Sequence, residues 1–248
     1  MCAGKISAGV VGTIANAVGI ALGGVLGLVL RKPLGIGTES WLKFVLGALT
    51  VYIGLRLTWT SLQGTFGQML GQLCVVVVAM MLGKVTGRLL GVQRLSNRLG
   101  KFARVGMETV PAGAGRFADG FKTCTVLFCA APLSVLGAVQ DGLSAYCAPL
   151  IVKAVMDGLT AFAMTRQFGW GVIASAIPVL AWQGTLTLVA HGLAPWLESY
   201  KLVGSINATG GLLVFSVALV MLGLKRIGLA DYLPALLYAP LLTALLKL

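Results

Sequence analysis

The chain has 248 residues, of which 58% are apolar and only 10% are charged. Soluble proteins contain about 45–50% apolar and about 25% charged residues, so this composition excludes a water-exposed fold. The formal net charge is +12, but most basic residues lie between apolar segments, where they set membrane topology. We therefore predict a helical membrane protein that does not bind nucleic acid.

Apolar segments separated by glycine, proline and charged residues recur along the whole chain. A helix that crosses a bilayer needs about 20 apolar residues. The fourth and fifth segments are short, which favours tilted, broken or re-entrant helices there. The sequence thus predicts an all-α bundle of about eight transmembrane helices, at residues 7–30, 41–58, 68–87, 121–139, 147–165, 169–196, 206–224 and 230–247.

Most lysine and arginine residues lie in or beside the loops that follow the odd-numbered segments. Loops rich in these residues stay in the cytoplasm, so we expect the odd-numbered loops inside and both termini outside. Lys5, Lys201 and Lys247 fall on the opposite side. The residues that define the inner side are Arg31, Lys32, Lys43, Lys84, Arg88, Arg94, Arg98, Lys101, Arg104, Arg116, Lys122, Arg166, Lys225 and Arg226.

The longest inner loop, residues 91–120, combines an apolar stripe with basic residues. Leu95, Leu99 and Phe102 have helical spacing, and Arg94, Arg98, Lys101 and Arg104 surround them. This pattern predicts an amphipathic helix on the inner leaflet that contacts anionic lipid headgroups. A docking surface for a partner protein is the alternative.

Two stretches of the chain resemble each other. Gly12-Thr-Ile-Ala-Asn-Ala-Val-Gly19 matches Gly171-Val-Ile-Ala-Ser-Ala-Ile-Pro178, which aligns Asn16 with Ser175. The copies lie five spans apart, an odd number, so they face opposite ways in the bilayer. We predict an inverted three-helix repeat, residues 1–90 and 167–248, with two short spans inserted at 121–166. Inverted repeats form the two gates of many secondary transporters, although a duplication without transport is also compatible with the pattern.

The fifth segment contains two charged residues, Lys153 and Asp157. Each costs at least about 2.5–3.5 kcal/mol in the membrane, and their spacing of four places them on one helix face. They are either an ion or proton site that substrate enters, or a satisfied structural pair.

Each of two Asp-Gly pairs accompanies a short segment, Gln140-Asp141-Gly142 and Asp157-Gly158. Glycine permits a helix to end or break, and exposed helix ends bind ions. We expect Asp141 in a helix-terminal turn at the outer surface and Asp157 deeper in the membrane.

Neutral polar residues also occur in the spans. Asn16, Ser175 and Gln183 either line a cavity or form interhelical hydrogen bonds worth about 0.6 kcal/mol each. Pro178 is expected to kink the sixth span, and Gly23, Gly24 and Gly27 to permit close helix packing.

Motifs for a cofactor, a metal or catalysis are absent from the sequence. The one histidine, His191, has no second ligand nearby, and the five cysteines lack metal-ligand spacing. No phosphate-binding loop, hydrolase elbow or zinc-protease motif occurs. We therefore expect no enzyme activity, cofactor or metal centre.

Several motifs resemble the YdfK/YqgA-type family of bacterial membrane proteins (domain of unknown function 554). The resemblance implies a bacterial inner membrane and a transport role. Ala130-Ala-Pro132 departs from the family pattern, which leaves the packing of the fourth span open. The motifs are Gly12–Asn16, Gly120–Cys129, Leu136–Leu143, Lys153–Gly158, Ser175–Pro178 with Gln183-Gly184, and Gly210-Gly211.

Taken together, these features predict a transporter or channel for a small solute or ion, with alternating access to a midplane polar site. Its residues are expected to be Lys153, Asp157, Asp141, Gln140, Asn16, Ser175 and Gln183. The alternative is a non-transporting scaffold or sensor that docks a partner through the basic loop. A homo-oligomer is compatible with either.

Overall fold

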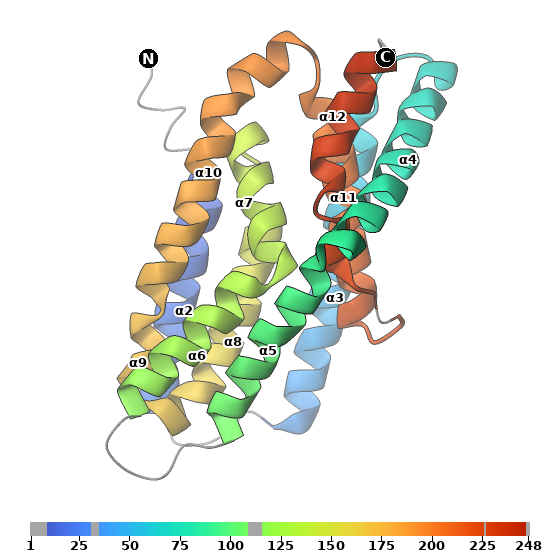
Figure 1. Cartoon of the computed structure of the whole chain (residues 1–248). Helices are drawn as coiled ribbons and strands as arrows, with labels where there is room; N and C mark the ends of the chain where they lie inside the picture. The colour runs from blue at the N-terminus through green and yellow to red at the C-terminus, as the bar shows by residue number, and fades with distance from the viewer. Residues whose placement is uncertain (1–8, 31–34, 109–115, 226, 247–248) are drawn as a thin grey trace. The chain divides into compact units, whose positions relative to one another are not determined.

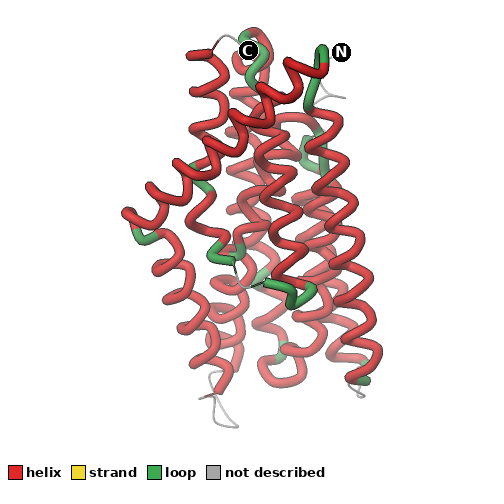
Figure 2. Tube along the Cα trace, turned by 90° about the vertical axis from the view of Figure 1, so that its right-hand side faces the viewer, coloured by secondary structure: helices red, strands yellow, loops and turns green. Residues whose placement is uncertain are grey.

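The computed structural model describes residues 9–30, 35–108, 116–225 and 227–246, and every regular element within these ranges is a helix (Figures 1 and 2). This confirms the predicted all-α class. In chain order the elements are α2 (Val11–Val29), α3 (Ile36–Ser61), α4 (Phe66–Leu90), α5 (Val92–Glu108), α6 (Arg116–Ala130), α7 (Pro132–Ser144), α8 (Ala148–Phe168), α9 (Trp170–Ala174), α10 (Ala176–Ser199), α11 (Val203–Met221), the 3₁₀ helix η1 (Leu229–Tyr232) and α12 (Ala235–Leu246).

Among the described residues, seven helical segments are long and apolar enough to cross a membrane. The pair α6–α7 passes the same test but bends by 61°, and it gives an eighth span when counted as one broken helix. The bend lies at Pro132, the first residue of α7. Proline has no backbone N–H to continue the hydrogen bonding of α6. The structure thus gives seven to eight candidate spans, in agreement with the predicted number of about eight, and α6–α7 is either a broken span or a re-entrant loop.

The chain folds into two compact units. The described residues of Met1–Glu39 and Leu95–Val189 form the first unit, and those of Ser40–Arg94 and Ala190–Leu248 form the second. Each unit therefore contains residues from both predicted repeats. The inverted repeat and the four-part division of the chain stay predictions.

In the first unit, α2 packs on α8 through backbone-to-backbone contact. A Cβ atom on Gly19 would lie 2.6 Å from the carbonyl oxygen of Ala154, and one on Gly23 or Gly27 would overlap the backbone of α8 in the same way. The numbers of the contacting residues increase together along both helices, so α2 and α8 run parallel. This confirms that the α2 glycines permit close packing.

The prediction that Asp157-Gly158 ends or breaks a helix is wrong, because α8 is continuous from Ala148 to Phe168. A Cβ on Gly158 would lie 2.8 Å from the carbonyl oxygen of Gly19. Gly158 is thus required for the close approach of α2, and not for a change in the direction of α8.

The sixth segment is interrupted between α9 and α10 at Ser175. Pro178 lacks the N–H that would bond the carbonyl of Ala174, which agrees with the predicted effect of this proline. The side chain of Ser175 donates to the carbonyl of Val172 at 2.6 Å.

α5 confirms the helix predicted in the basic loop. Leu95 and Phe102 are more than half exposed, as a face that contacts lipid or a partner would be. Residues 109–115, within the predicted loop at 91–120, lie outside the described residues.

The second unit is also held by close glycine contacts. A Cβ on Gly54 of α3 would lie 2.7 Å from the carbonyl oxygen of Gly211 on α11, and one on Gly83 of α4 would lie 2.5 Å from the backbone nitrogen of Ala235 on α12. The hydroxyl of Thr58 donates to the carbonyl of Ala208 at 3.2 Å. Small residues let these helix backbones approach each other.

Replacing Gly158 by leucine is expected to destabilise the protein by at least about 1–3 kcal/mol, because the new side chain overlaps the backbone of α2. Thermal unfolding of detergent-purified protein measures the effect. Gly192→Leu on α10 is the control, since a Cβ there meets no heavy atom within 4 Å. Unfolding of Gly158→Leu at the wild-type temperature would contradict this packing.

Candidate functional site

Lys153 and Asp157 form a buried ion pair on α8. The Lys153 Nζ lies 2.6 Å from the Asp157 Oδ2, and the two residues are 2% and 8% exposed. The spacing of four residues therefore produces the pairing predicted for it. Neither side chain faces the surrounding lipid.

Asn16 of α2 connects this pair to α10. Its side-chain nitrogen donates to the Asp157 Oδ2 at 3.2 Å and to the Gln183 Oε1 at 3.1 Å. Gln183 in turn donates to the hydroxyl of Ser134 on α7 at 2.9 Å. We call these five residues the central polar cluster: Asn16, Ser134, Lys153, Asp157 and Gln183.

The cluster lies where the surrounding helices are interrupted or closest. Ser134 is in the first turn of α7, directly after the 61° bend. Asp157 is near the middle of α8, next to the glycine that contacts α2. Buried charges need partners, and Asp157 obtains two of them, from Lys153 and Asn16.

Asp141 is fully buried, so the prediction that it lies in a turn at the surface is wrong. Its Oδ2 accepts hydrogen bonds from the backbone N–H groups of Gly12 at 2.9 Å and Thr13 at 3.3 Å. The first N–H groups of a helix have no partner within it and carry partial positive charge. Asp141 therefore caps α2 from another helix.

A second pair of hydroxyls lies beside this cap. Thr13 Oγ1 and Thr187 Oγ1 are 3.0 Å apart, and both residues are fully buried. We call Thr13, Asp141 and Thr187 the terminal polar layer. It lies about one helical turn from Asn16 and Gln183, toward the end at which α2 begins.

Gln140 is 1% exposed, and neither atom of its side-chain amide has a partner within the described part of the chain. The Oδ1 atoms of Asn16 and Asp141 are also buried and have no hydrogen-bond partner among the described residues. Buried polar atoms are nearly always hydrogen-bonded in proteins. These three residues consequently have unused capacity to bind a polar ligand.

Ser175 does not join the cluster, although the repeat aligns it with Asn16. α2 and α9–α10 run antiparallel, since Thr13 meets Thr187 and Asn16 meets Gln183. Ser175 is eight residues before Gln183, which corresponds to about 12 Å along a helix. Its hydroxyl bonds its own backbone instead.

Sequence reasoning missed Ser134, Thr13 and Thr187. The two threonines are each one helical turn from a residue that was selected, which is the signal that was available. For Ser134 the signal was its position just after the proline that breaks the fourth span.

On the other side of the cluster, the first unit is mainly apolar, and the buried hydroxyls of Thr165 and Ser175 there donate to nearby backbone carbonyls, those of Ala161 and Val172. Ile20 is one turn beyond Asn16, Ala161 is one turn beyond Asp157, and Val179 is one turn from Gln183. These residues belong to a buried core that contains Ile20, Cys124, Phe128, Ala161, Met164, Phe168, Val172 and Val179. The polar and apolar halves of the unit thus meet at the ion pair.

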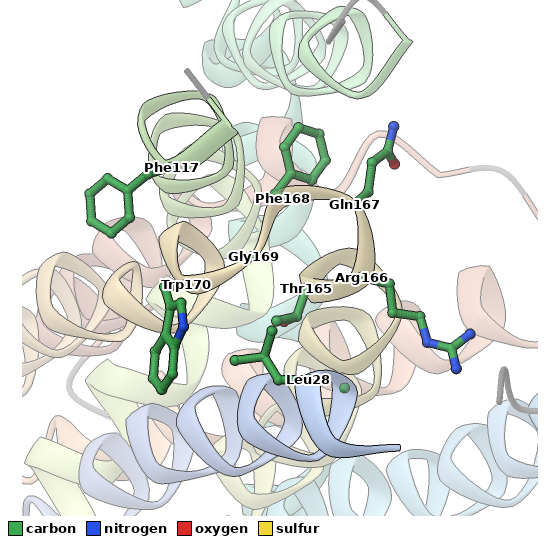
Figure 3. A pocket seen from close by; sticks show the side chains of 9 residues that line it. Leu28, Phe117, Thr165, Arg166, Gln167, Phe168, Gly169 and Trp170 are labelled. Atoms are coloured by element: carbon green, nitrogen blue, oxygen red, sulfur yellow. The ribbon is translucent and has the colours of Figure 1, made fainter. Parts of the chain in front are cut away.

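A surface pocket lies beyond this core, at the turn that joins α8 to α9 (Figure 3). Figure 3 shows the side chains of Leu28, Arg166 and Trp170 around the turn at Gly169. Arg166 donates to the carbonyl of Leu30 at 3.1 Å and lies over the ring of Phe162. This pocket includes no residue of the central polar cluster.

Metal-ligand clusters of three or more His, Cys, Asp or Glu residues do not occur in the described ranges. The absence of a metal or cofactor in the functional protein stays a prediction.

Comparison with known proteins gives one family and two similar chains. The family model "Protein of unknown function (DUF554)" matches residues 11–244. The chain is 27% identical over 230 residues to the "Uncharacterized membrane protein YdfK" of Bacillus subtilis (strain 168), which covers 92% of this chain and 93% of that protein. It is 28% identical over 237 residues to the "Uncharacterized protein YqgA" of Escherichia coli (strain K12), covering 95% and 97%. No solved structure matches. Together with the apolar helices, the similarity to a membrane protein indicates a multi-pass membrane protein.

Removing one partner of the ion pair is expected to cost more than removing both charges. Lys153→Met leaves Asp157 uncompensated and should lower the free energy of unfolding by about 3–5 kcal/mol. Adding Asp157→Asn should recover a large part of that loss. Thermal unfolding of the single and double variants measures both effects, with Lys122→Met, at an exposed position, as the control. A double variant as unstable as the sum of the singles would show that the two charges do not interact.

Proposed function

The chain belongs to the DUF554 family, and we propose that it is a transporter or channel for a small solute or ion, which binds at the central polar cluster. The proposal includes no catalysed reaction. It follows from the residues that the first unit buries, and not from the names of its relatives.

One observation supports the proposal above all others: five polar side chains from four helices, two of them an ion pair, form one cluster inside the membrane-spanning part. Charged residues in such a position are costly and usually mark ion or substrate pathways. A cluster that served packing alone would have no reason to leave the Oδ1 of Asn16 without a partner.

The distribution of polar groups indicates how the site is reached. The terminal polar layer extends from the cluster toward the start of α2, while the buried core around Ile20 closes the opposite direction. The three residues of the terminal polar layer are fully buried. We propose that this arrangement is a closed state of an alternating-access cycle, which polar species enter from the end at which α2 begins when this layer opens.

The breaks in the surrounding helices supply places for the second state to form. α6–α7 bends by 61° beside Ser134, and the span Trp170–Ser199 has a local irregularity at Ser175. Transporters with inverted repeats use such discontinuous helices around a midplane site. The inverted relation of residues 1–90 and 167–248 is part of the proposal, supported by the likeness of Gly12–Gly19 to Gly171–Pro178.

Orientation also belongs to the proposal. The basic residues of the odd-numbered loops favour a cytoplasmic position for those loops. In a bacterial inner membrane, both termini and the start of α2 would then face outward, and the polar route would begin outside the cell.

A scaffold or sensor is the second candidate, and α5 is the observation that favours it. Its exposed Leu95 and Phe102 accompany Arg94, Arg98 and Lys101. The same face suits anionic headgroups, which we propose as its normal contact. Copurification of a cytoplasmic protein that is lost in Arg98→Gln/Lys101→Gln would favour the scaffold instead.

The transport proposal is tested with purified protein in two steps. Thermal shift across a panel of inorganic ions, amino acids, sugars and nucleosides identifies a ligand, since binding to the folded state raises the unfolding temperature. Uptake of that labelled compound into proteoliposomes is then measured. We expect uptake by the wild type, and none above protein-free liposomes for Asp157→Asn or Lys153→Met.

Asp119→Asn, near the start of α6 and away from the cluster, is the matched control and should transport normally. Reconstituted amounts are equalised so that a loss of folded protein is not read as a loss of transport. Wild-type uptake rates in both cluster variants would exclude this site.

A further inference from the structure

The charges buried in the first unit do not balance. Within the described residues, three charged side chains of this unit are buried: Asp141 at 0%, Lys153 at 2% and Asp157 at 8% exposure. Two carboxylates and one ammonium group leave a surplus of one negative charge when all three are ionised. An isolated buried charge is strongly unfavourable, so such groups pair, bind a metal ion or lose their charge.

Lys153 does not compensate Asp141, because its ammonium group is bonded to the Asp157 Oδ2 at 2.6 Å. The hydrogen bonds of Asp141 come from the backbone N–H groups of Gly12 and Thr13, and both reach its Oδ2. The start of α2 adds only a partial positive charge. The Oδ1 of Asp141 stays buried and unpartnered among the described residues.

The unpartnered buried side-chain atoms on α2 and α7 are mostly oxygens. Asn16 follows Gly12 by one turn of α2, and its Oδ1 has no partner because its nitrogen makes both of its hydrogen bonds. Gln140 precedes Asp141 and adds one oxygen and one nitrogen. Carboxylate and amide oxygens are ligands for hard cations. An anion would instead need donors, and among these unpartnered atoms only the Gln140 nitrogen is a donor.

We infer that the first unit binds one small alkali-metal cation such as Na⁺ beside Asp141, with the Asn16 and Gln140 side chains supplying further oxygens. This inference rests on the proposed function and names its substrate or coupling ion. The cation would supply the positive charge that Asp141 lacks, one turn of α2 away from the Lys153–Asp157 pair.

The test measures the unfolding temperature of detergent-purified protein in NaCl and in choline chloride at equal ionic strength and pH. We expect Na⁺ to raise this temperature by roughly 5–10 °C at about 100 times its dissociation constant. Asp141→Asn keeps an oxygen for the N–H groups of α2 but removes the charge. It should unfold at the same temperature in both salts, while Asp119→Asn should respond like the wild type.

Lys153→Met provides an independent test, because it raises the surplus to two negative charges. Its unfolding temperature should be lower than that of the wild type in choline chloride and should rise more on addition of NaCl. If Asp141→Asn does not fold, Lys153→Met still tests whether Na⁺ binds in the first unit. A smaller response to Na⁺ than in the wild type would overturn the inference.

Equal unfolding temperatures of the wild type in the two salts would also overturn it. So would stabilisation by lower pH with no effect of Na⁺, which would assign the charge balance to a proton on Asp141. Transport is not needed for this measurement. A missing Na⁺ effect with Asp157-dependent uptake would defeat the inference alone, and a Na⁺ effect without any uptake would defeat the proposed function.

Discussion

The close contact between α2 and α8 is the constraint on which the polar interior of the first unit depends. Helix axes usually lie about 8–10 Å apart, but Gly19, Gly23 and Gly158 let these two backbones touch. Because α2 lies so close, the short side chain of Asn16 reaches Asp157. The same approach brings the start of α2 to Asp141 on α7. The close packing of α2 on α8 therefore also determines which groups contact the buried charged residues.

Function follows from the division of this unit into two halves. Hydroxyl, amide and carboxyl groups extend from the ion pair toward the start of α2, and a mainly apolar core fills the other side, where the hydroxyls of Thr165 and Ser175 bond to backbone carbonyls. A site with polar groups on both sides would let ions leak through the membrane. A site enclosed by apolar residues would be out of reach for a polar ligand. The observed asymmetry is what one closed gate next to an intramembrane binding site requires. Because buried polar groups are costly, their accumulation on one side is best explained by a ligand that uses them.

Properties that depend on local spacing could be predicted from the sequence, and those that depend on distant partners could not. The apolar segments and the Lys153–Asp157 pair are local patterns, and the structure contains seven to eight candidate spans and the ion pair. Asp141 was misplaced because its partners are N–H groups 128 and 129 residues away. Gly158 was misread because glycine serves both helix breaks and helix contacts, and only the neighbouring helix distinguishes them. Ser175 was chosen by alignment with Asn16, but antiparallel packing joins Asn16 to Gln183 instead.

The central claim is that the polar half of the first unit opens to water during transport and becomes a route to the ion pair, and cysteine accessibility tests this most directly. Thr187 is fully buried in the terminal polar layer, whereas Val189, two residues later on α10, is 56% exposed on the apolar surface. In a chain whose native cysteines are replaced, Thr187→Cys should react with a charged, membrane-impermeant thiol reagent in proteoliposomes, and Val189→Cys should not. Reaction of Val189→Cys with no reaction of Thr187→Cys would contradict the account.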